Sequence, residues 1–216
     1  MSKTSRVLRT DGEATYNRIL DVAGCLFASA GFAETTNKMI ATQAEVDLAS
    51  INYHFGSRNG LYQAVLVEAH QRLLSIERLQ QLISTPLPAR DKLRQLIQHL
   101  VQSTIGEQGW HATVLSREFL APSSHLQSLQ QTEIPAKLPF ILNILSEITS
   151  IPVEEPALLR CLVSVVAPCA MLLVVGPNVS PIAAEIHRMS QQDLIEHLYN
   201  FAIGGLEAVG NSRLTC

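Results

Sequence analysis

Apolar residues recur at intervals of three and four along most of the chain, which is the spacing of one face of a helix. The clearest stripe lies between residues 13 and 30, and Gly31 stands where a helix of that length would end. No stretch alternates apolar and polar residues over several hairpin-sized segments, so the pattern predicts an all-α fold. The first stripe consists of Ile19, Val22, Ala23, Leu26, Phe27 and Ala30.

Two short helices are predicted after this stripe, with a tight turn between them. The first begins after Thr36, and the second covers about residues 48–55 after Asp47, because both residues are good helix caps. In the second, Ile51 and Phe55 lie four residues apart and face the core, which turns the other residues partly or wholly outward. This is the layout of a helix-turn-helix that reads DNA. The inner face of the first short helix is formed by Met39, Ile40 and Ala44.

The pattern divides the chain into three parts: a flexible basic arm at 1–12, a helix-turn-helix domain at 13–62 and a larger helical domain at 63–216. Ser190 and Asp193 resemble a capping box, and Gly210 is expected to stop the last helix. The predicted helices of the larger domain cover about residues 58–83, 89–105, 110–120, 154–175 and 190–209, with an irregular, proline-containing region at 123–150.

Charge and composition limit the possible partners. The net charge is −3, and residues 1–62 carry six cations and six acids, so a single DNA-binding head should bind weakly and be paired with another. The longest apolar run, residues 161–175, is shorter than the roughly 20 residues that span a bilayer, so no membrane segment is expected. The chain begins without a secretory signal pattern and its four cysteines show no metal-ligand spacing, which favours a reducing cytoplasm.

The predicted helix at about residues 48–55 carries the side chains that direct readout of DNA requires. Ser50 and Asn52 are predicted to contact bases, and Leu48 and Ala49 to pack on thymine methyl groups. The alternatives without a DNA-binding role are that Tyr53 is a core aromatic and that Lys38 and Arg58 are ordinary solvated charges. The predicted phosphate contacts are Tyr53, His54, Arg58, Lys38 and Thr36, and the arm residues Lys3, Arg6 and Arg9 are placed either in the minor groove or in a plain disordered terminus.

These motifs resemble one known family. The segments 19–27, 31–32 and 35–41 and the run Ile51-Asn-Tyr-His-Phe-Gly-Ser-Arg58 look like the TetR family of bacterial transcriptional regulators. The resemblance implies that three amino-terminal helices bind DNA within a homodimer, and that a larger helical domain binds a small effector which changes the spacing of the two heads. Residues 115–122 are similar to a Ser-Arg-Glu segment of the CecR-like branch. Glu45 and Asn52 depart from the family pattern, in which Gly and an aromatic residue are common.

The larger domain offers fewer signals. Arg117 with Glu118 is either a solvated or structural charge pair or the polar anchor of a pocket. The helix at 154–175 is apolar almost all round, so it and the last helix are expected to form half of a four-helix bundle across a two-fold axis. Cys161 and Cys169 are best explained as small buried residues. The predicted ligand-binding residues are Trp110, His111, Arg117, Glu118, Phe140 and Met171.

The sequence therefore predicts a homodimeric, ligand-responsive regulator that binds a palindromic double-stranded DNA operator, more often as a repressor. No nucleophile-base motif, phosphate loop or metal spacing is present, so no catalytic residue, metal or cofactor is assigned. The alternatives are an all-helical enzyme or small-molecule-binding protein without DNA-binding function, and a helical protein-interaction module. Binding to duplex DNA that weakens with salt would separate these classes.

Overall fold

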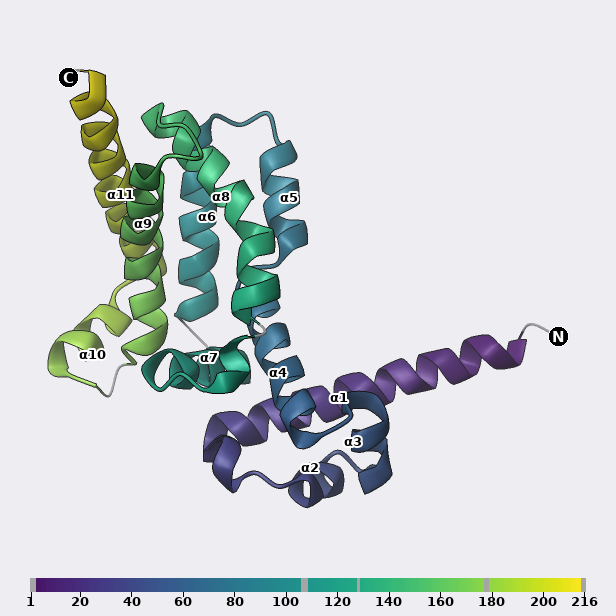
Figure 1. Ribbon diagram of the computed structural model, residues 1–216. Coiled ribbons are helices and arrows are strands. Elements are labelled where there is room, and N and C mark those ends of the chain that lie inside the picture. The colour runs from purple at the N-terminus through teal and green to yellow at the C-terminus, as the bar shows by residue number, and fades with distance from the viewer. Residues whose placement is uncertain (1–2, 106–108, 128, 177–178, 215–216) are drawn as a thin grey trace. The chain divides into compact units, whose positions relative to one another are not determined.

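The computed structural model describes the backbone of residues 3–105, 109–127, 129–176 and 179–214, and the side chains of residues 11–212 within those ranges. Every regular element in these ranges is helical (Figure 1), which confirms the predicted all-α fold. The chain divides into two compact units. The first comprises Met1–His70 and Gly109–Leu129, and the second comprises Gln71–Gln108 and Gln130–Cys216.

The first unit is built around α1 (Lys3–Glu34), which packs against both α2 (Asn37–Gln43) and α7 (Trp110–Leu120). It also holds α3 (Leu48–Phe55), most of α4 (Arg58–Leu73) and a 3₁₀ turn, η1 (Ser124–Leu126). Residues 109–129 thus belong with the helix-turn-helix, although the sequence pattern places them in the larger domain. The core side chains of this unit include Ile19, Leu20, Ala23, Phe27, Ile40, Ile51, Leu61, Val65, Leu66 and Leu115.

Two consecutive threonines link α1 to α2. Gly31 has a φ of 84°, which interrupts the helical geometry near the end of α1. The buried hydroxyl of Thr35 then shares its one proton between the carbonyl oxygens of Gly31 at 2.8 Å and Leu26 at 3.2 Å, at the end of the helix where carbonyl groups lack backbone partners. The hydroxyl of Thr36 accepts from the backbone N–H of Met39 at 3.2 Å and so caps α2, as predicted.

In the second unit, α6 (Ala89–Thr104) packs against α8 (Ile134–Thr149), α9 (Pro156–Val174) and α11 (Gln191–Leu214). Helix α5 (Ile76–Ser84) covers α8, a π-helical turn η2 (Leu129–Glu133) precedes α8, and α10 (Pro181–Arg188) lies between α9 and α11 in the chain (Figure 1). The core of this unit includes Leu79, Leu93, Leu96, Ile97, Val101, Ile144, Leu145, Leu158, Val165 and Leu206.

The structure corrects three predictions in the amino-terminal part. Residues 3–12 belong to α1 and are helical, whereas a flexible arm was expected, because the helix continues across Gly12 without a proline to break it. Met39, predicted to face inward, is 41% exposed, since a seven-residue helix buries only a narrow stripe. Asp47 precedes α3 in extended geometry but makes no side-chain capping hydrogen bond.

The expected long helix at 58–83 is broken in two. Helix α4 ends at Leu73, and Ser75 caps α5 by accepting a hydrogen bond from the backbone N–H of Arg78 at 3.1 Å. The apolar stripe continues across the break, with Leu74 and Leu79 both buried, so hydrophobic periodicity alone does not reveal it. A serine that can cap a helix was the available signal.

The carboxy-terminal half differs from expectation at two further places. Residues 134–149 form the regular helix α8 despite Pro139, and α10 has no predicted counterpart. Helix α11 continues past Gly210 to Leu214. Gly210 is buried, and a Cβ atom there would lie 2.7 Å from the carbonyl oxygen of Thr149, so this glycine permits close packing on α8 instead of ending a helix.

Helix α9 is long and apolar enough, by length and composition alone, to cross a membrane, with a mean hydropathy of 2.3. Cys161, Val165 and Cys169 lie on its buried face and pack in the core of its own unit. We therefore interpret α9 as a core helix with one uncovered side. Burial raises the pKa of Cys169 to about 11, which agrees with a packing role for this thiol. The large exposed apolar residues of α9 are Leu159, Val163 and Met171.

Candidate nucleic-acid interface

The turn between α2 and α3 is tight. Ala44 caps α2, and Glu45 adopts a φ of 52°, in the left-handed region that favours glycine. A non-glycine residue there is strained by about 1 kcal/mol. The backbone N–H of Val46 donates to the carbonyl of Ala41 at 3.0 Å and closes the turn, so Glu45 keeps the helix-turn-helix connection intact.

Helix α3 presents one face to solvent. Ile51 is completely buried, whereas Leu48 is 50% exposed and Tyr53 is 85% exposed. Ala49 and Asn52 are also exposed, and Ser50 is half-buried. The exposure of Tyr53 excludes the alternative that it is a core aromatic. This eight-residue helix exposes both polar and apolar side chains. Readout in the major groove uses both kinds, since polar groups bond to base edges and apolar groups pack on thymine methyl groups.

Aromatic packing fixes the carboxy-terminal end of α3. The ring of Phe55 stacks on that of Tyr16 from α1, with centroids 4.6 Å apart. His54 is half-buried and its ring stands edge-on to Tyr53 at 5.0 Å and to Tyr16 at 6.0 Å. Gly56, with a φ of 72°, then ends the helix. The orientation of the exposed face is therefore set by contacts within the first unit.

The predicted phosphate contacts differ in their surroundings. Lys38 is exposed on α2, and Thr36 is exposed while its hydroxyl caps that helix. Arg58 is engaged within the molecule: its guanidinium donates to the carbonyl oxygens of Phe32 and Ala33 and lies 4.2 Å from the centroid of the Phe32 ring. The structure thus gives Arg58 a role in holding the end of α1 against α4, where the sequence predicts a phosphate contact.

Arg18 is an exposed residue of α1 to which the sequence assigned no role. In the structure Arg18 lines a shallow polar hollow of about 530 Å³ beside the first turn of α3, together with Ser50. Glu45 and Asp47 also line it, so one cation there faces two acids. Arg18 meets these acids because the turn between α2 and α3 packs beside α1. The spacing of residues along the chain does not reveal this proximity.

Helix α7 is fastened to α1 in the same unit. The indole N–H of Trp110 donates to Oδ1 of Asp21 at 3.2 Å. The Trp110 ring packs on Gly24, where an added Cβ would lie 2.3 Å from a ring carbon. Nη2 of Arg117 donates to the carbonyl oxygen of Ser29 at 3.2 Å. Two of the predicted ligand-binding residues thus connect α7 to the helix that supports the DNA-reading face.

Glu118 joins α7 to α4. Its side chain is 4% exposed, and its carboxylate accepts hydrogen bonds from the hydroxyl of Tyr62 at 2.8 Å and from the N–H and hydroxyl of Ser123 at 2.9–3.1 Å. The ring of His125 lies 5.2 Å from that of Tyr62 and 4.8 Å from that of Phe32. A buried carboxylate satisfied by three donors is a structural arrangement that rigidifies its surroundings.

The structure divides the predicted ligand-binding set between the two units. Trp110, with His111 beside it at a ring distance of 6.2 Å, lies in the first unit with Arg117 and Glu118. In the second unit, Phe140 is half-buried against the core and Met171 is 51% exposed. Among the described residues no group of three or more His, Cys, Asp or Glu side chains has the arrangement of a metal site.

Two family models match the chain. The model of the bacterial regulatory proteins of the tetR family matches residues 19–65, which contain α2 and α3 entirely. The model of the C-terminal domain of the HTH-type transcriptional dual regulator CecR matches residues 89–206, more than half of the chain. The chain belongs to the TetR family. It is a transcriptional regulator that binds DNA, and its carboxy-terminal domain is CecR-like, so both predicted resemblances are confirmed.

Known relatives of this TetR-family protein agree with that assignment. The HTH-type transcriptional regulator AcrR of Shigella flexneri is 29% identical over 106 residues, about half the length of either chain. FadR of Bacillus subtilis, solved in complex with stearoyl-CoA, has a TM-score of 0.67 at 19% identity over 88% of this chain and 98% of that chain. A TetR-like regulator from Rhodococcus sp. RHA1 has a TM-score of 0.65 at 20% identity, covering 89% and 95%. These two structures show a shared fold.

Proposed function

We propose that this TetR-family protein is a repressor that binds a palindromic operator as a homodimer and releases it when a small molecule binds the second unit. In this proposal Ser50 and Asn52 read bases, Leu48 and Ala49 pack on thymine methyl groups, and Tyr53 and His54 contact phosphates. Lys38 and Thr36 contact phosphates from α2. The protein acts in the cytoplasm, where its DNA lies.

The observation that carries the proposal is the exposed face of α3. Tyr53 is 85% exposed although aromatic side chains tend to be buried, and Asn52 is exposed beside it. Neither side chain contributes to the core, whereas Ile51 and Phe55 hold the helix in place from the other side. An ordered helix that presents aromatic and amide groups to solvent is suited to enter the major groove.

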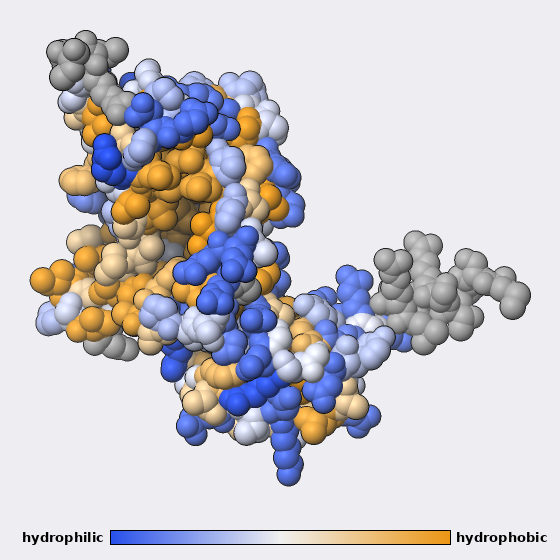
Figure 2. Space-filling view, viewed as in Figure 1, coloured by the Kyte–Doolittle hydropathy of each residue, from blue (hydrophilic) through white to orange (hydrophobic). Residues whose placement is uncertain are grey.

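The homodimer is supported by a second exposed face, on α9 and α11. Phe201 is 74% exposed on α11, and Val163 is 63% exposed on α9. The two helices pack on one another, and a hollow of about 250 Å³ between them is lined by Phe201, Gly205, Cys161 and Val165, among others. Apolar side chains gather over α9 and α10 on the surface (Figure 2). Contiguous exposed apolar surface of this kind favours a protein interface.

Small residues on α11 support close approach of a second copy. Gly204 and Gly205 are exposed, and a Cβ atom at either position would meet no described atom within 4 Å. Glycines in a helix interior cost stability, so two in succession on an exposed face favour a use for the space that they leave. A helix of the second copy, placed by a two-fold axis, would fill it and complete a four-helix bundle.

The experiment that tests the proposal measures DNA binding and assembly separately. Fluorescence anisotropy with duplexes from the DNA flanking the gene should find an inverted repeat that binds more tightly than scrambled DNA, with an affinity that falls as salt rises. Sedimentation in the absence of DNA should give a dimer. Absence of any salt-sensitive duplex binding would refute the DNA-binding role, and a monomer at micromolar concentration would refute the homodimer.

Activation is the second candidate mode of regulation. The carboxy-terminal match is to the domain of a protein described as a dual regulator, so that protein's description includes both directions. The two modes differ in transcription from the operator, which a repressor lowers and an activator raises in a reconstituted assay. We favour repression because it requires only occupancy of the operator by the dimer.

A further inference from the structure

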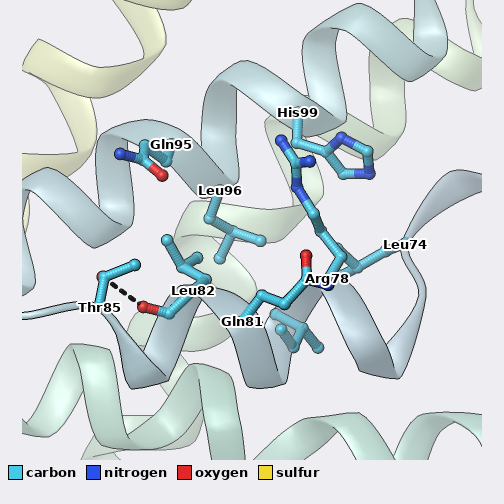
Figure 3. Close-up of a pocket in the computed structure, with 9 residues that line it drawn as sticks. Leu74, Arg78, Gln81, Leu82, Thr85, Gln95, Leu96 and His99 are labelled. Carbon is cyan, nitrogen blue, oxygen red and sulfur yellow. Dashed lines mark hydrogen bonds between the residues drawn. The ribbon is translucent and has the colours of Figure 1, made fainter.

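A groove between α5 and α6 in the second unit has the chemistry of a ligand site. Nine residues line it, and its volume is about 220 Å³. The floor is apolar, since Leu79 is fully buried and Leu96 is 1% exposed. The rim is polar, with Arg78 and His99 side by side at one end and Gln95 and Thr85 at the other (Figure 3). None of these residues belongs to the ligand-binding set predicted from the sequence.

Among the residues that the structure describes, the cation of this groove has no anionic partner. Arg78 is exposed at the rim, and no described carboxylate lies within salt-bridge distance of its guanidinium. Glu77 precedes it on α5 but is not among the lining residues, and no Asp or Glu is. Three other arginines of this unit are paired: Arg94 with Glu196, Arg188 with Glu185, and Arg90 with Glu207 at 2.6 Å. Arg78 is therefore available to an anion from outside.

His99 adds a hydrogen-bonding group without adding charge. Burial, and then the nearby Arg78 guanidinium, lower the pKa of His99 from its ordinary value, while a hydrogen bond with the backbone of Leu73 acts in the opposite direction. The ring is accordingly neutral at pH 7. The net positive charge of the groove comes from Arg78 alone, which matches one negative charge on a ligand.

The size and floor of the groove restrict the rest of the ligand. Pockets for drug-sized molecules measure about 300–1,000 Å³, so a groove of about 220 Å³ suits a smaller molecule. The leucine floor favours an apolar body next to the charged end. A phosphate group carries nearly two negative charges and is usually held by several donors, whereas a carboxylate pairs with a single planar guanidinium in a bidentate manner.

From this arrangement we infer that the α5–α6 groove binds a small monocarboxylate with an apolar body, its carboxylate on Arg78 and its body over Leu79, Leu82 and Leu96. As an effector site, the groove deepens the proposed ligand-released repressor and rests on it. The binding reaction itself does not depend on DNA.

The groove lies close in the chain to α4, the helix that leads back to the DNA-binding unit. Leu74 lines the groove and lies in the break between α4 and α5, directly before the capping residue Ser75. Helix α4 begins at Arg58, in the first unit. A ligand that binds one geometry of this junction better than another shifts the population of α4 arrangements, which is the requirement for release of DNA.

The charge requirement is tested with benzoate and hexanoate as carboxylate probes, benzamide as the uncharged counterpart and inorganic phosphate as a second anion. Isothermal titration without DNA should show binding of a carboxylate at millimolar or lower concentration and at least roughly tenfold weaker binding of benzamide and phosphate. Arg78→Gln should weaken carboxylate binding at least roughly tenfold. Arg188→Gln, at an exposed arginine on α10, is the matched control and should bind as the wild type does.

A second pair of variants tests the location independently of charge. Gln95 is exposed at the rim, so Gln95→Trp should block the groove without altering the core, while Gln98→Trp, on the same helix but outside the lining, should not. Equal binding by Gln95→Trp and Gln98→Trp would overturn the location. Absence of carboxylate binding, equal affinity for benzamide, or phosphate as the tighter anion would overturn the ligand class.

Failure of this inference can be told apart from failure of the proposed function. A protein that binds operator DNA but no carboxylate in this groove contradicts the ligand site alone. A protein that binds benzoate or hexanoate through Arg78 but shows no salt-sensitive DNA binding contradicts the repressor role alone. If both reactions occur, the carboxylate should lower operator affinity in the wild type and in Arg188→Gln, and Arg78→Gln should remove that effect.

Discussion

The phenol hydroxyl of Tyr62 donates a hydrogen bond of 2.8 Å to Oε1 of Glu118. Tyr62 lies on α4 and Glu118 on α7, and both side chains are buried in the first unit. The match to the tetR family model ends at residue 65, so the segment 109–129 lies outside it. The Tyr62–Glu118 contact nevertheless ties this segment to the helices that support the DNA-reading face. The Arg117–Glu118 pair, ambiguous in the sequence, makes structural contacts on both sides of α7.

We expect Tyr62→Phe to lower the free energy of unfolding by about 1.5–3 kcal/mol, because a hydrogen bond to a charged group contributes about that much. Urea denaturation measures the change. Tyr53→Phe is the matched control, since Tyr53 is 85% exposed and its hydroxyl should matter by less than about 0.5 kcal/mol to folding. Equal losses in the two variants would show that the Tyr62–Glu118 bond does not stabilise the unit.

The same bond predicts a pH dependence at alkaline pH. Burial, and then the hydrogen bond and charge of Glu118, raise the pKa of Tyr62 well above its ordinary value of 10.0, although Arg117 opposes the shift. The unfolded chain then releases this proton at lower pH than the folded chain. The contribution of Tyr62 is therefore complete below about pH 10 and is lost as pH rises towards the folded pKa.

Urea titrations of wild type and Tyr62→Phe over this range test the sign. The stability difference between the two proteins should be constant from about pH 7 to pH 9 and should shrink above about pH 10. Tyr16, whose pKa burial also raises, is present in both proteins and so cancels in the comparison. A difference that grows with pH would contradict the assignment.

Two glycines of α1 give a matched pair for the attachment of α7. Gly12 has open space around it, so Gly12→Ala should stabilise the helix by about 0.5–1 kcal/mol. At Gly24 an added Cβ would lie 2.3 Å from the Trp110 ring, and overpacking costs about 1–3 kcal/mol, so Gly24→Ala should destabilise. Trp110 is the only tryptophan of the chain, so its fluorescence reports directly on this contact.

In Gly24→Ala the emission of Trp110 should shift to the red as the indole leaves its site, whereas in Gly12→Ala it should stay unchanged. The reverse order of stability, with Gly24→Ala gaining as Gly12→Ala does, would mean that α7 is not held against α1 at this position. Operator affinity measured in parallel would show whether loosening α7 changes DNA binding.

Local patterns in the sequence were sufficient for much of the fold. The predicted helix at 110–120 has the limits of α7, because Gly109 stands directly before its start and Pro122 follows its end. The face of α3 followed from the spacing of Ile51 and Phe55. The pairing of Ser190 with the backbone N–H of Asp193, at 3.0 Å, was readable from a capping signature. In each case the physical cause lies within four residues of its effect.

What the sequence did not reveal are contacts that join residues far apart in the chain. Its place in the motif predicts that Arg58 contacts a phosphate, yet its guanidinium donates hydrogen bonds to carbonyl groups 25 and 26 residues earlier in the chain. Gly210 has the position of a helix stop, yet its lack of a side chain serves packing on Thr149. The α5–α6 groove forms only when two helices lie side by side, and hydrophobic periodicity does not predict which helices are neighbours.

The exposed face of α9 and α11 predicts how assembly responds to mutation. Burying a phenylalanine contributes about 1.5–3 kcal/mol, and a two-fold interface contains Phe201 twice, so Phe201→Glu should weaken the dimer by at least about 3 kcal/mol, or roughly 100-fold. Sedimentation without DNA measures this change. Leu48→Glu, at an exposed leucine of α3, is the control and should leave the dimer intact. Unchanged assembly in Phe201→Glu would place the interface elsewhere.

Base and phosphate contacts of the reading face predict different responses to DNA sequence and salt. Asn52→Ala and Ser50→Ala should each relax sequence preference, by about 1–3 kcal/mol at the base concerned. Lys38→Ala should weaken binding to all sequences alike. A dimer would lose two phosphate contacts in that variant, so its salt slope should fall by about 1.8. Anisotropy titrations at several salt concentrations, with operator and scrambled duplexes, separate the two classes.

Arg58→Ala serves as the contrasting variant in the same titrations. Its guanidinium holds carbonyl groups of α1, so the substitution should lower the melting temperature while leaving the salt slope of the remaining folded protein unchanged. Lys38 is exposed and should show the opposite combination, a reduced slope at unchanged stability. If Arg58→Ala reduces the slope as Lys38→Ala does, Arg58 reaches a phosphate in the complex, and the DNA-bound arrangement of the α1 end differs from the one described above.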